Sequence, residues 1–257
     1  MKSQAYKITG FAAVMGALGF MLRWLQGMQI YDEATGLADR SAAINVWVIV
    51  LLAGTITALI VWSILLRKYE PLRDHKALVG KSFLYRLVGR VAGAVLALAG
   101  FWLLFAAGKS ELPGMQRVLA LFQILGGVSA ILLAAHADAP GQAKTRRVAA
   151  VLLVLCGCMF MVTVYRENAA NPVLWEFAPE ILALCAATLA LYYTAGYQFG
   201  QPKPFCGIFF CHAGLFLCML CVTDMGLSPQ AAAYAALALL LGMQGFVQTA
   251  NLSRKES

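Results

Sequence analysis

The sequence predicts an all-α integral membrane protein, a bundle of about eight transmembrane helices. Of its 257 residues 61% are hydrophobic and only 12% are charged, about half the charge of a soluble domain. The hydrophobic residues form stretches of about 18 residues or more with few charges, the length at which a helix crosses a bilayer. Strands of a membrane barrel would be shorter and would alternate apolar with polar residues.

Taken in chain order, the hydrophobic stretches predict spans at 8–26, 42–66, 91–108, 118–136, 148–165, 178–199, 205–223 and 230–249. The first could be a signal peptide, because Lys2 and Lys7 precede it. However, Arg23 and Trp24 stand where a small-residue cleavage site belongs, and seven more spans follow, so we expect it to be retained. None of the eight prolines falls in the middle of a span, which predicts mostly unbroken helices.

The distribution of basic residues predicts the orientation. If the spans alternate from a cytoplasmic N-terminus, fifteen of the 20 lysines and arginines fall inside, and the outside keeps Arg23, Arg40, Lys109, Arg117 and Arg166. This is a strong positive-inside asymmetry. We therefore expect a multi-pass protein of the cytoplasmic (plasma) membrane with both termini cytoplasmic. Because this arrangement explains the net charge of +8, the charge does not indicate nucleic-acid binding.

A weak internal similarity suggests a duplication within the single transmembrane domain, 1–257. "FAAVMGALGF" from Phe11 resembles "VAAVLLVLCG" from Val148. The halves 1–140 and 141–257 would then be two tandem four-helix repeats, which run parallel because each has an even number of spans. Chance similarity between apolar helices is the alternative.

Small residues recur four positions apart, as at Gly89, Gly93 and Ala97. In lipid, where apolar burial alone does not drive association, such spacing lets two helices approach closely. The sequence therefore predicts a compact bundle with close helix contacts along this stretch.

Three groups of polar residues are candidate sites. Charges at the outer ends of the spans, which either line a vestibule for a small polar solute or simply mark the water boundary, are Arg23, Glu176, Glu180 and Asp224. Polar residues inside spans, which either line a pathway or bond neighbouring helices, are Thr55, Gln123 and Gln244. Basic residues suited to anionic inner-leaflet lipids, or else to setting topology alone, are Lys76, Lys81, Arg86 and Arg90.

The segment "FCGIFFCHAGLFLCMLC", Phe205 to Cys221, raises the question of a metal site. Its spacing offers at most two ligands on one helix, whereas zinc takes four, and a buried thiol serves as a small hydrophobe. A remote alternative is an intramembrane thiol or metal enzyme, which requires Cys158, Cys185, Cys218 and Cys221, or His136 and His212, to converge. We predict no metal, no cofactor and no catalytic residue.

The loop "YDEATGLADR" after the first span resembles the D-x-x-T-G-L outer loop of uncharacterised multi-pass membrane proteins from anaerobic bacteria. The similarity covers the first span and this loop, about an eighth of the chain. The resemblance implies a bacterial inner-membrane class and no particular activity.

Two hypotheses of function remain. The first is a small-solute transporter or permease-like component, and the second is a non-catalytic sensor or scaffold subunit that binds a membrane-protein partner. A polar cavity that reaches mid-bilayer and is lined by Gln123, Gln244 or Thr55 favours transport. A solid apolar interior favours the scaffold. Both place the protein in contact with the lipid bilayer.

Overall fold

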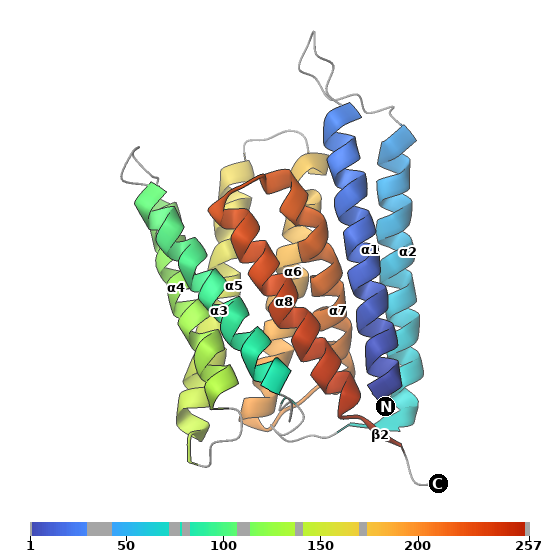
Figure 1. Ribbon diagram of the computed structural model, residues 1–257, viewed down its shortest axis with the longest axis vertical. Coiled ribbons are helices and arrows are strands. Elements are labelled where there is room, and N and C mark those ends of the chain that lie inside the picture. Colours follow the sequence, from blue (N-terminus) through green and yellow to red (C-terminus); the bar gives the residue numbers. More distant parts are fainter. Residues whose placement is uncertain are drawn as a thin grey trace.

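A computed structural model describes residues 2–29, 43–71, 78, 83–106, 114–136, 141–169 and 174–254. This part of the chain contains eight helices that are long and apolar enough to cross a membrane. They run side by side along one axis, and both termini lie at the same end of the bundle (Figure 1). The prediction of an all-α membrane bundle is confirmed.

Each predicted span falls on one helix. The long helices are α1 (Lys2–Gln29), α2 (Ala43–Leu65), α3 (Phe83–Ala106), α4 (Gly114–Ala135), α5 (Ala143–Asn168), α6 (Leu174–Gly196), α7 (Pro204–Cys221) and α8 (Pro229–Ala250). The short elements are the 3-10 helices η1 (Leu66–Lys68), η4 (Tyr197–Phe199) and η5 (Val222–Met225), and the strands β1 (Tyr69–Glu70) and β2 (Ser253–Arg254).

The largest difference from the sequence prediction is at the start of α3. The helix begins at Phe83 rather than at 91, so Arg86 and Arg90 lie in its first turns. Charged side chains end an apolar stretch but not a helix, because the backbone hydrogen bonds continue into the headgroup region. Hydropathy therefore locates the hydrocarbon boundary and underestimates the length of the helix.

Local sequence explains where the last two long helices begin. Proline occupies the first position of α7 (Pro204) and of α8 (Pro229), where its missing N–H is not needed. Ser228 caps α8 by accepting a hydrogen bond from the Ala231 amide at 3.1 Å. These signals place sharp turns between α6, α7 and α8, so the three helices pack as neighbours.

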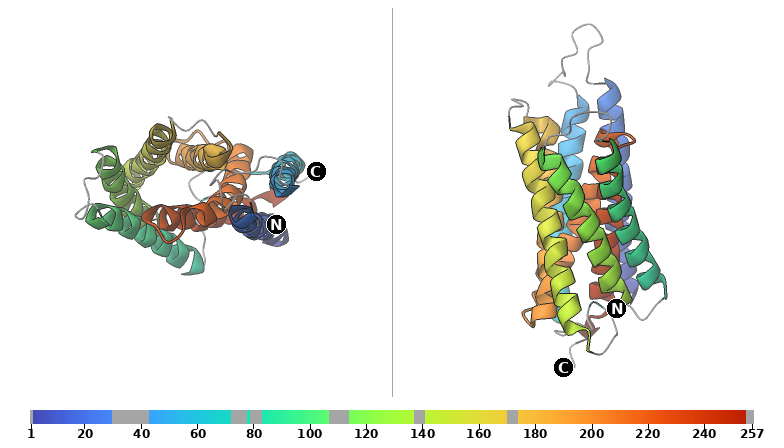
Figure 2. Two further views of the ribbon diagram at one scale, coloured as in Figure 1. Left: turned by 90° about the horizontal axis from the view of Figure 1, so that it is seen from above. Right: turned by 90° about the vertical axis from the view of Figure 1, so that its left-hand side faces the viewer.

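Six helices form a closed ring. Each of α3 to α8 contacts the next, and α8 packs against α3 to complete the circuit. The view along the bundle shows α1 and α2 outside this arrangement (Figure 2). We call the first group the six-helix ring and the other two helices the α1–α2 hairpin. The hairpin packs against α7 and α8, and β1 pairs with β2 next to the C-terminus.

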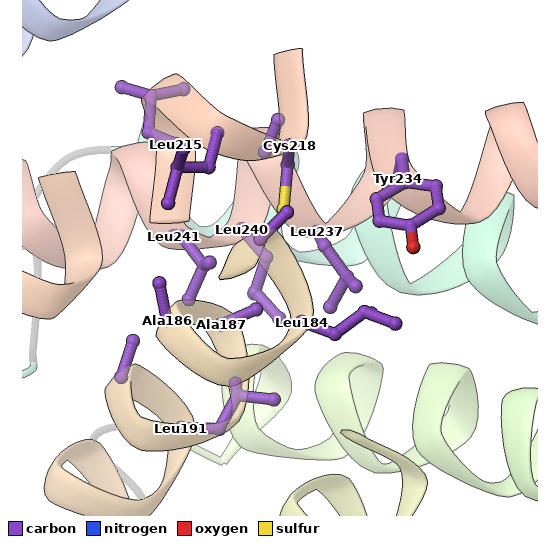
Figure 3. Close-up of a cluster of buried hydrophobic side chains, with 14 of the residues drawn as sticks. Leu184, Ala186, Ala187, Leu191, Leu215, Cys218, Tyr234, Leu237, Leu240 and Leu241 are labelled. Carbon is purple, nitrogen blue, oxygen red and sulfur yellow. The ribbon is translucent and has the colours of Figure 1, made fainter. Parts of the chain in front are cut away.

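The cysteine-rich α7 lies at the centre of the bundle, in contact with α1, α2, α6 and α8. Cys211, Cys218 and Cys221 are fully buried, and Cys218 packs among leucines of α6 and α8 (Figure 3). A thiol fills such a position because it is small and weakly polar. One hydrophobic core runs through both halves of the chain, and the tandem repeat of 1–140 and 141–257 stays a prediction.

The seam between α3 and α4 confirms the close contact predicted from small-residue spacing. A Cβ atom added to Gly93 would lie 2.6 Å from the Gly127 carbonyl oxygen, and one added to Gly100 would lie 2.6 Å from the Ala120 oxygen. A Cβ on Gly89 would come within 2.9 Å of the Ala134 Cβ. The two backbones therefore touch along the seam, as lipid-embedded helices do at small residues.

Candidate functional site

A cavity lies inside the six-helix ring, in the half of the bundle that carries the termini. Its walls come from α3, α4, α5, α6 and α8, and its volume is about 30 Å³, room for about two water molecules. Gln244 lines it six residues before the end of α8, and Tyr85 lines it two residues after the start of α3. At about 1.5 Å per helical residue, both lie within about 9 Å of a helix end. The cavity therefore lies in the half of the bundle nearer the chain termini and does not run the full length of the helices.

Gln244 lines this cavity and carries an unsatisfied hydrogen-bond acceptor. Its Nε2 donates a hydrogen bond to the Tyr85 hydroxyl at 3.3 Å. Its Oε1 is buried and has no hydrogen-bond partner in the part of the chain that the structure describes. A buried amide oxygen without a donor is costly. A water molecule or a bound solute that donates a hydrogen bond to Oε1 would remove this cost.

The rest of the wall is almost wholly apolar. Alanine, leucine, glycine and methionine supply ten of the 13 described lining residues, and none of the 13 is charged. The buried basic residue of α5 is Arg146, one turn from the lining residue Ala150. Its Nη1 donates to the His136 carbonyl oxygen at 3.2 Å. The arrangement is an apolar chamber with a few hydrogen-bonding groups, the usual composition of a small-molecule site.

A second polar layer lies beside the cavity wall. Gln248 donates from Nε2 to the Thr194 hydroxyl at 3.4 Å, and Thr194 lines the cavity. The Gln248 Oε1 atom points toward Gly207 of α7, because a Cβ added there would lie 2.7 Å from it. Gln248 therefore joins α6, α7 and α8 behind the wall and does not face the chamber.

His212 continues this layer toward the hairpin. Its Nδ1 lies 2.7 Å from the Ile208 carbonyl oxygen, which can only accept, so Nδ1 carries the proton. Its Nε2 lies 2.9 Å from the Thr9 hydroxyl and accepts from it. Intramembrane histidines commonly take part in function, but here Nδ1 is used in a hydrogen bond within α7 and Nε2 is used to attach α1 to α7.

Of the three predicted intramembrane polar residues, only Gln244 lines the cavity. Gln123 is fully buried near the middle of α4, and both atoms of its amide group are without partners among the described residues. Thr55 is fully buried in α2, outside the ring, and its hydroxyl is likewise unpartnered in the described chain. Both lie apart from the lining residues.

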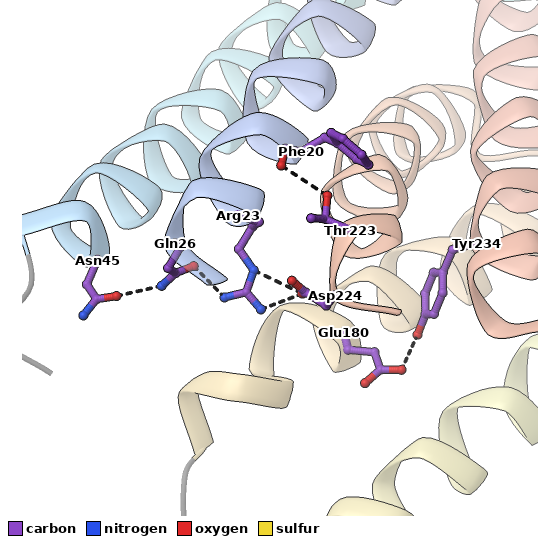
Figure 4. Close-up of polar contacts among 8 residues, drawn as sticks. All are labelled: Phe20, Arg23, Gln26, Asn45, Glu180, Thr223, Asp224 and Tyr234. Carbon is purple, nitrogen blue, oxygen red and sulfur yellow. Dashed lines mark hydrogen bonds and ion pairs between the residues drawn. The ribbon is translucent and has the colours of Figure 1, made fainter. Parts of the chain in front are cut away.

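The predicted outer charges lie at the end of the bundle opposite the termini, in two separate pairings (Figure 4). Arg23 Nη2 is 2.6 Å from Asp224 Oδ2, and its Nε is 3.1 Å from the same oxygen. Glu180 instead accepts from the Tyr234 hydroxyl at 3.0 Å. Glu176 lies in α6, and its side chain is outside the described part. A vestibule formed by these residues stays a prediction.

Tyr234 is a residue of the site that sequence reasoning missed. It is fully buried, and its ring centre is 5.1 Å from that of Phe160 in α5. Together with Leu184 and Leu237 it fills the interior of the ring on the side away from the cavity (Figure 3). The available signal was a tyrosine within an apolar span, since a buried phenol requires a hydrogen-bond partner.

Two of the predicted lipid-contact residues, Lys76 and Lys81, lie outside the described residues. Arg86 is half-buried and Arg90 is exposed, both on the first turns of α3. Both residues therefore lie near the start of α3, at the end of the bundle where the two chain termini lie. Their contact with anionic lipid stays a prediction.

The cysteines and histidines do not assemble a metal site in the described chain. No group of three or more His, Cys, Asp or Glu residues there could hold a metal ion. His136 uses its Nδ1 to bond the Leu132 carbonyl oxygen in its own helix, at 3.1 Å. The loop 31–40, which carries the D-x-x-T-G-L pattern, lies outside the described residues.

The fold and its long apolar helices define the class: the chain is a multi-pass membrane protein. Comparison with protein-family models, with curated proteins and with solved structures gave no match. Its role therefore has to be argued from the cavity and from the residues that close the ring around it.

Proposed function

We propose that the protein is a small-solute transport component, permease-like in character, and that the six-helix ring carries the solute. The observation that supports this most directly is the cavity between five helices of the ring, which is lined by Gln244, a residue whose Oε1 atom is buried without a partner among the described residues. Of the residues that were expected to line a transport pathway, Gln244 lines this cavity, whereas the rest of its wall is mostly apolar and it lies in the half of the bundle that carries the termini. A space between several helices suits a compartment that opens and closes.

The two ends of the ring differ in a way that fits alternating access. The half with the termini holds the cavity, whereas the other half is filled by Tyr234, Phe160 and their neighbours. The Tyr234–Glu180 hydrogen bond joins α8 to α6 at the filled end. The structure then represents a state closed toward the outside, with its remaining space near the inner side.

We further propose that the protein lies in the cytoplasmic membrane with both termini inside, and that it belongs with the membrane proteins that carry the D-x-x-T-G-L loop. The excess of lysine and arginine in alternate loops supports the orientation. A cysteine at Ser257 is expected to escape an impermeant maleimide in intact cells, and a cysteine at Ser41 is expected to react. Labelling of Ser257→Cys in intact cells, with Ser41→Cys protected, would contradict the orientation.

The alternative function, a sensor or scaffold subunit, is favoured by the α1–α2 hairpin. It lies outside the ring, and α2 exposes large side chains such as Trp47, Val50 and Ile64. A partner helix could cover this face, as could lipid. The two functions are separable, because a scaffold does not require the cavity to reach water.

Access to the cavity is tested by cysteine labelling in a variant without the seven native cysteines. Ala134→Cys lines the cavity, whereas Leu98→Cys lies on the outer surface of α3, where the side chain is 64% exposed. A water-soluble thiosulfonate applied to inside-out vesicles is expected to react with Ala134→Cys and not with Leu98→Cys, because a thiol in lipid stays protonated. A scaffold with a closed interior predicts no reaction at either position.

Transport itself is tested with proteoliposomes exposed to a ¹³C-labelled extract of polar metabolites. We expect at least one compound to enter wild-type vesicles about tenfold faster than vesicles with Ala134→Trp, which fills the cavity. A thermal unfolding transition shows whether Ala134→Trp is folded. If it is not folded, the labelling of Ala134→Cys tests the cavity in its place. Equal contents in wild-type, variant and empty vesicles would contradict a transport function.

A further inference from the structure

We infer that the cavity binds a small uncharged solute that donates a hydrogen bond, and that Gln244 selects it. This deepens the proposed function and rests on it for its biological meaning. The charge, the hydrogen bonding and the size of the chamber define the class of solute and the residue that recognises it.

The charge of the wall excludes an ion as the preferred occupant. The 13 described lining residues include no acid, no base and no histidine. An ion moved from water into an apolar chamber needs an opposite charge or several strong hydrogen bonds to replace its hydration. Arg146 lies one turn beyond the wall, and its Nη1 is directed to the His136 carbonyl oxygen. The uncharged form of a solute is therefore the one that this chamber accommodates.

The hydrogen-bonding pattern requires that the solute be a donor. The Gln244 Nε2 is already bonded to Tyr85, and the Oε1 has no partner among the described residues. Because Oε1 is buried beside the chamber, a small movement of the Gln244 side chain would bring it to an N–H or O–H group of the solute, while the apolar part of the solute would contact the surrounding alanines and leucines. Discrimination is strong at such a position, because a solute without the donor leaves a buried acceptor unpaired.

The size of the chamber limits the solute to a few heavy atoms unless the wall moves. A volume of about 30 Å³ corresponds to about two water molecules. Gly89 and Ala134 are in close contact in the wall, since a methyl group added to Gly89 would lie 2.9 Å from the Ala134 Cβ. A shift of α3 along α4 at this contact would enlarge the chamber for a somewhat larger solute.

Acetate, acetamide and acetamidinium provide a direct test, since they share one planar shape and differ in charge. Acetamide is expected to raise the unfolding temperature of the wild-type protein in nanodiscs, because a ligand that binds only the folded state stabilises it. The two ions are expected to have no effect at equal concentration and ionic strength. Equal or greater stabilisation by either ion, or no effect of acetamide, would overturn the inference.

Variants of Gln244 test its role. Gln244→Met keeps the length of the side chain and removes its hydrogen bonds, and we expect the apparent affinity for acetamide to fall about five- to tenfold. Gln244→Glu is expected to transfer the preference to acetamidinium. Gln248→Met is the matched control, because it removes a buried amide behind the wall, and it should keep the response to acetamide. Full retention of the acetamide response in Gln244→Met would refute the role of Gln244. If that variant does not fold, a Gln244→Glu protein that still prefers acetamide to acetamidinium would refute it.

These measurements separate the inference from the function on which it rests. If acetamide stabilises the protein but no solute enters proteoliposomes, the transport function is contradicted and the site for an uncharged solute is supported. Conversely, accumulation of a charged metabolite that Ala134→Trp blocks would support transport and contradict the uncharged class.

Discussion

Substituting Gly127 with valine is expected to separate α3 from α4 and to remove most of the folded protein. A Cβ atom at this position would lie 2.5 Å from the Ala97 backbone nitrogen and would also contact the Gly93 carbonyl oxygen. Both are backbone atoms, so no side-chain rotation relieves the contact, and the helices have to move apart. Overpacking costs about 1–3 kcal/mol even where side chains can adjust, and we expect about 3 kcal/mol or more here.

Gly54→Val is the matched control for this prediction. Gly54 also lies in the interior of a long helix, and nothing is within 4 Å of the position that its Cβ would take. We expect its effect on stability to be within about 0.5 kcal/mol, as for surface substitutions. Reversible unfolding in mixed micelles and the yield of monodisperse protein provide the comparison. Equal stability of the two variants would show that the α3–α4 seam does not hold the fold.

Most of the fold could be predicted from the sequence because hydropathy is a local property. An 18-residue apolar stretch has few ways to satisfy its backbone in lipid other than as a helix, so the eight spans follow from composition alone. Their arrangement does not. That α8 closes the ring against α3, with the hairpin outside, depends on side-chain fit between segments distant in the chain. The spacing of Gly89, Gly93 and Ala97 indicated a close seam but did not identify α4 as the partner.

The candidate site was less predictable than the fold. Gln123 and Gln244 look alike in sequence, each an amide in an apolar span, and only Gln244 lines the cavity. The two residues differ in their tertiary surroundings, because a cavity forms where several helices diverge. The sequence of one helix does not contain that information. Tyr85 and Thr194, which complete the polar part of the wall, are more than 100 residues apart in the chain. A polar residue in a span therefore predicts a need for a partner but not which partner meets it.

The outer charges show the same limit. Topology placed Arg23 and Asp224 on the same side of the membrane, which was enough to expect them in one region. The predicted topology did not distinguish between two arrangements of these charges, a vestibule that binds a solute and an ion pair between the two side chains. In the structure their charged groups are 2.6 Å apart and only 11% and 26% exposed, so much of the charge expected to face the outside is neutralised within this pair. Glu180, bonded to Tyr234, is directed into the ring and not toward Arg23.

The Arg23–Asp224 ion pair is expected to hold the α1–α2 hairpin against the ring at the end of the bundle opposite the termini. Arg23 also donates to Gln26 at 2.9 Å, and Gln26 donates to Asn45 of α2 at 2.7 Å, so the pair connects both hairpin helices to η5. Asp224→Asn removes the negative charge of the Asp224 carboxyl group from beside the partly buried guanidinium. We expect a coupling energy of about 1–3 kcal/mol in a double-mutant cycle with Arg23→Gln, together with faster amide exchange in the last turns of α1.

Two comparisons decide whether this ion pair acts as a specific attachment. The reversed pair, Arg23→Asp with Asp224→Arg, is expected to recover part of the stability that either reversal alone loses, because opposite charges again face each other. Glu167→Gln removes an acid that is exposed at the same end and accepts a hydrogen bond from the Gln116 amide at 2.8 Å. Its effect is expected to be below about 0.5 kcal/mol, since exposed charges contribute little. A coupling energy near zero, or an equal loss from Glu167→Gln, would mean that apolar packing of α1 on α7 alone positions the hairpin.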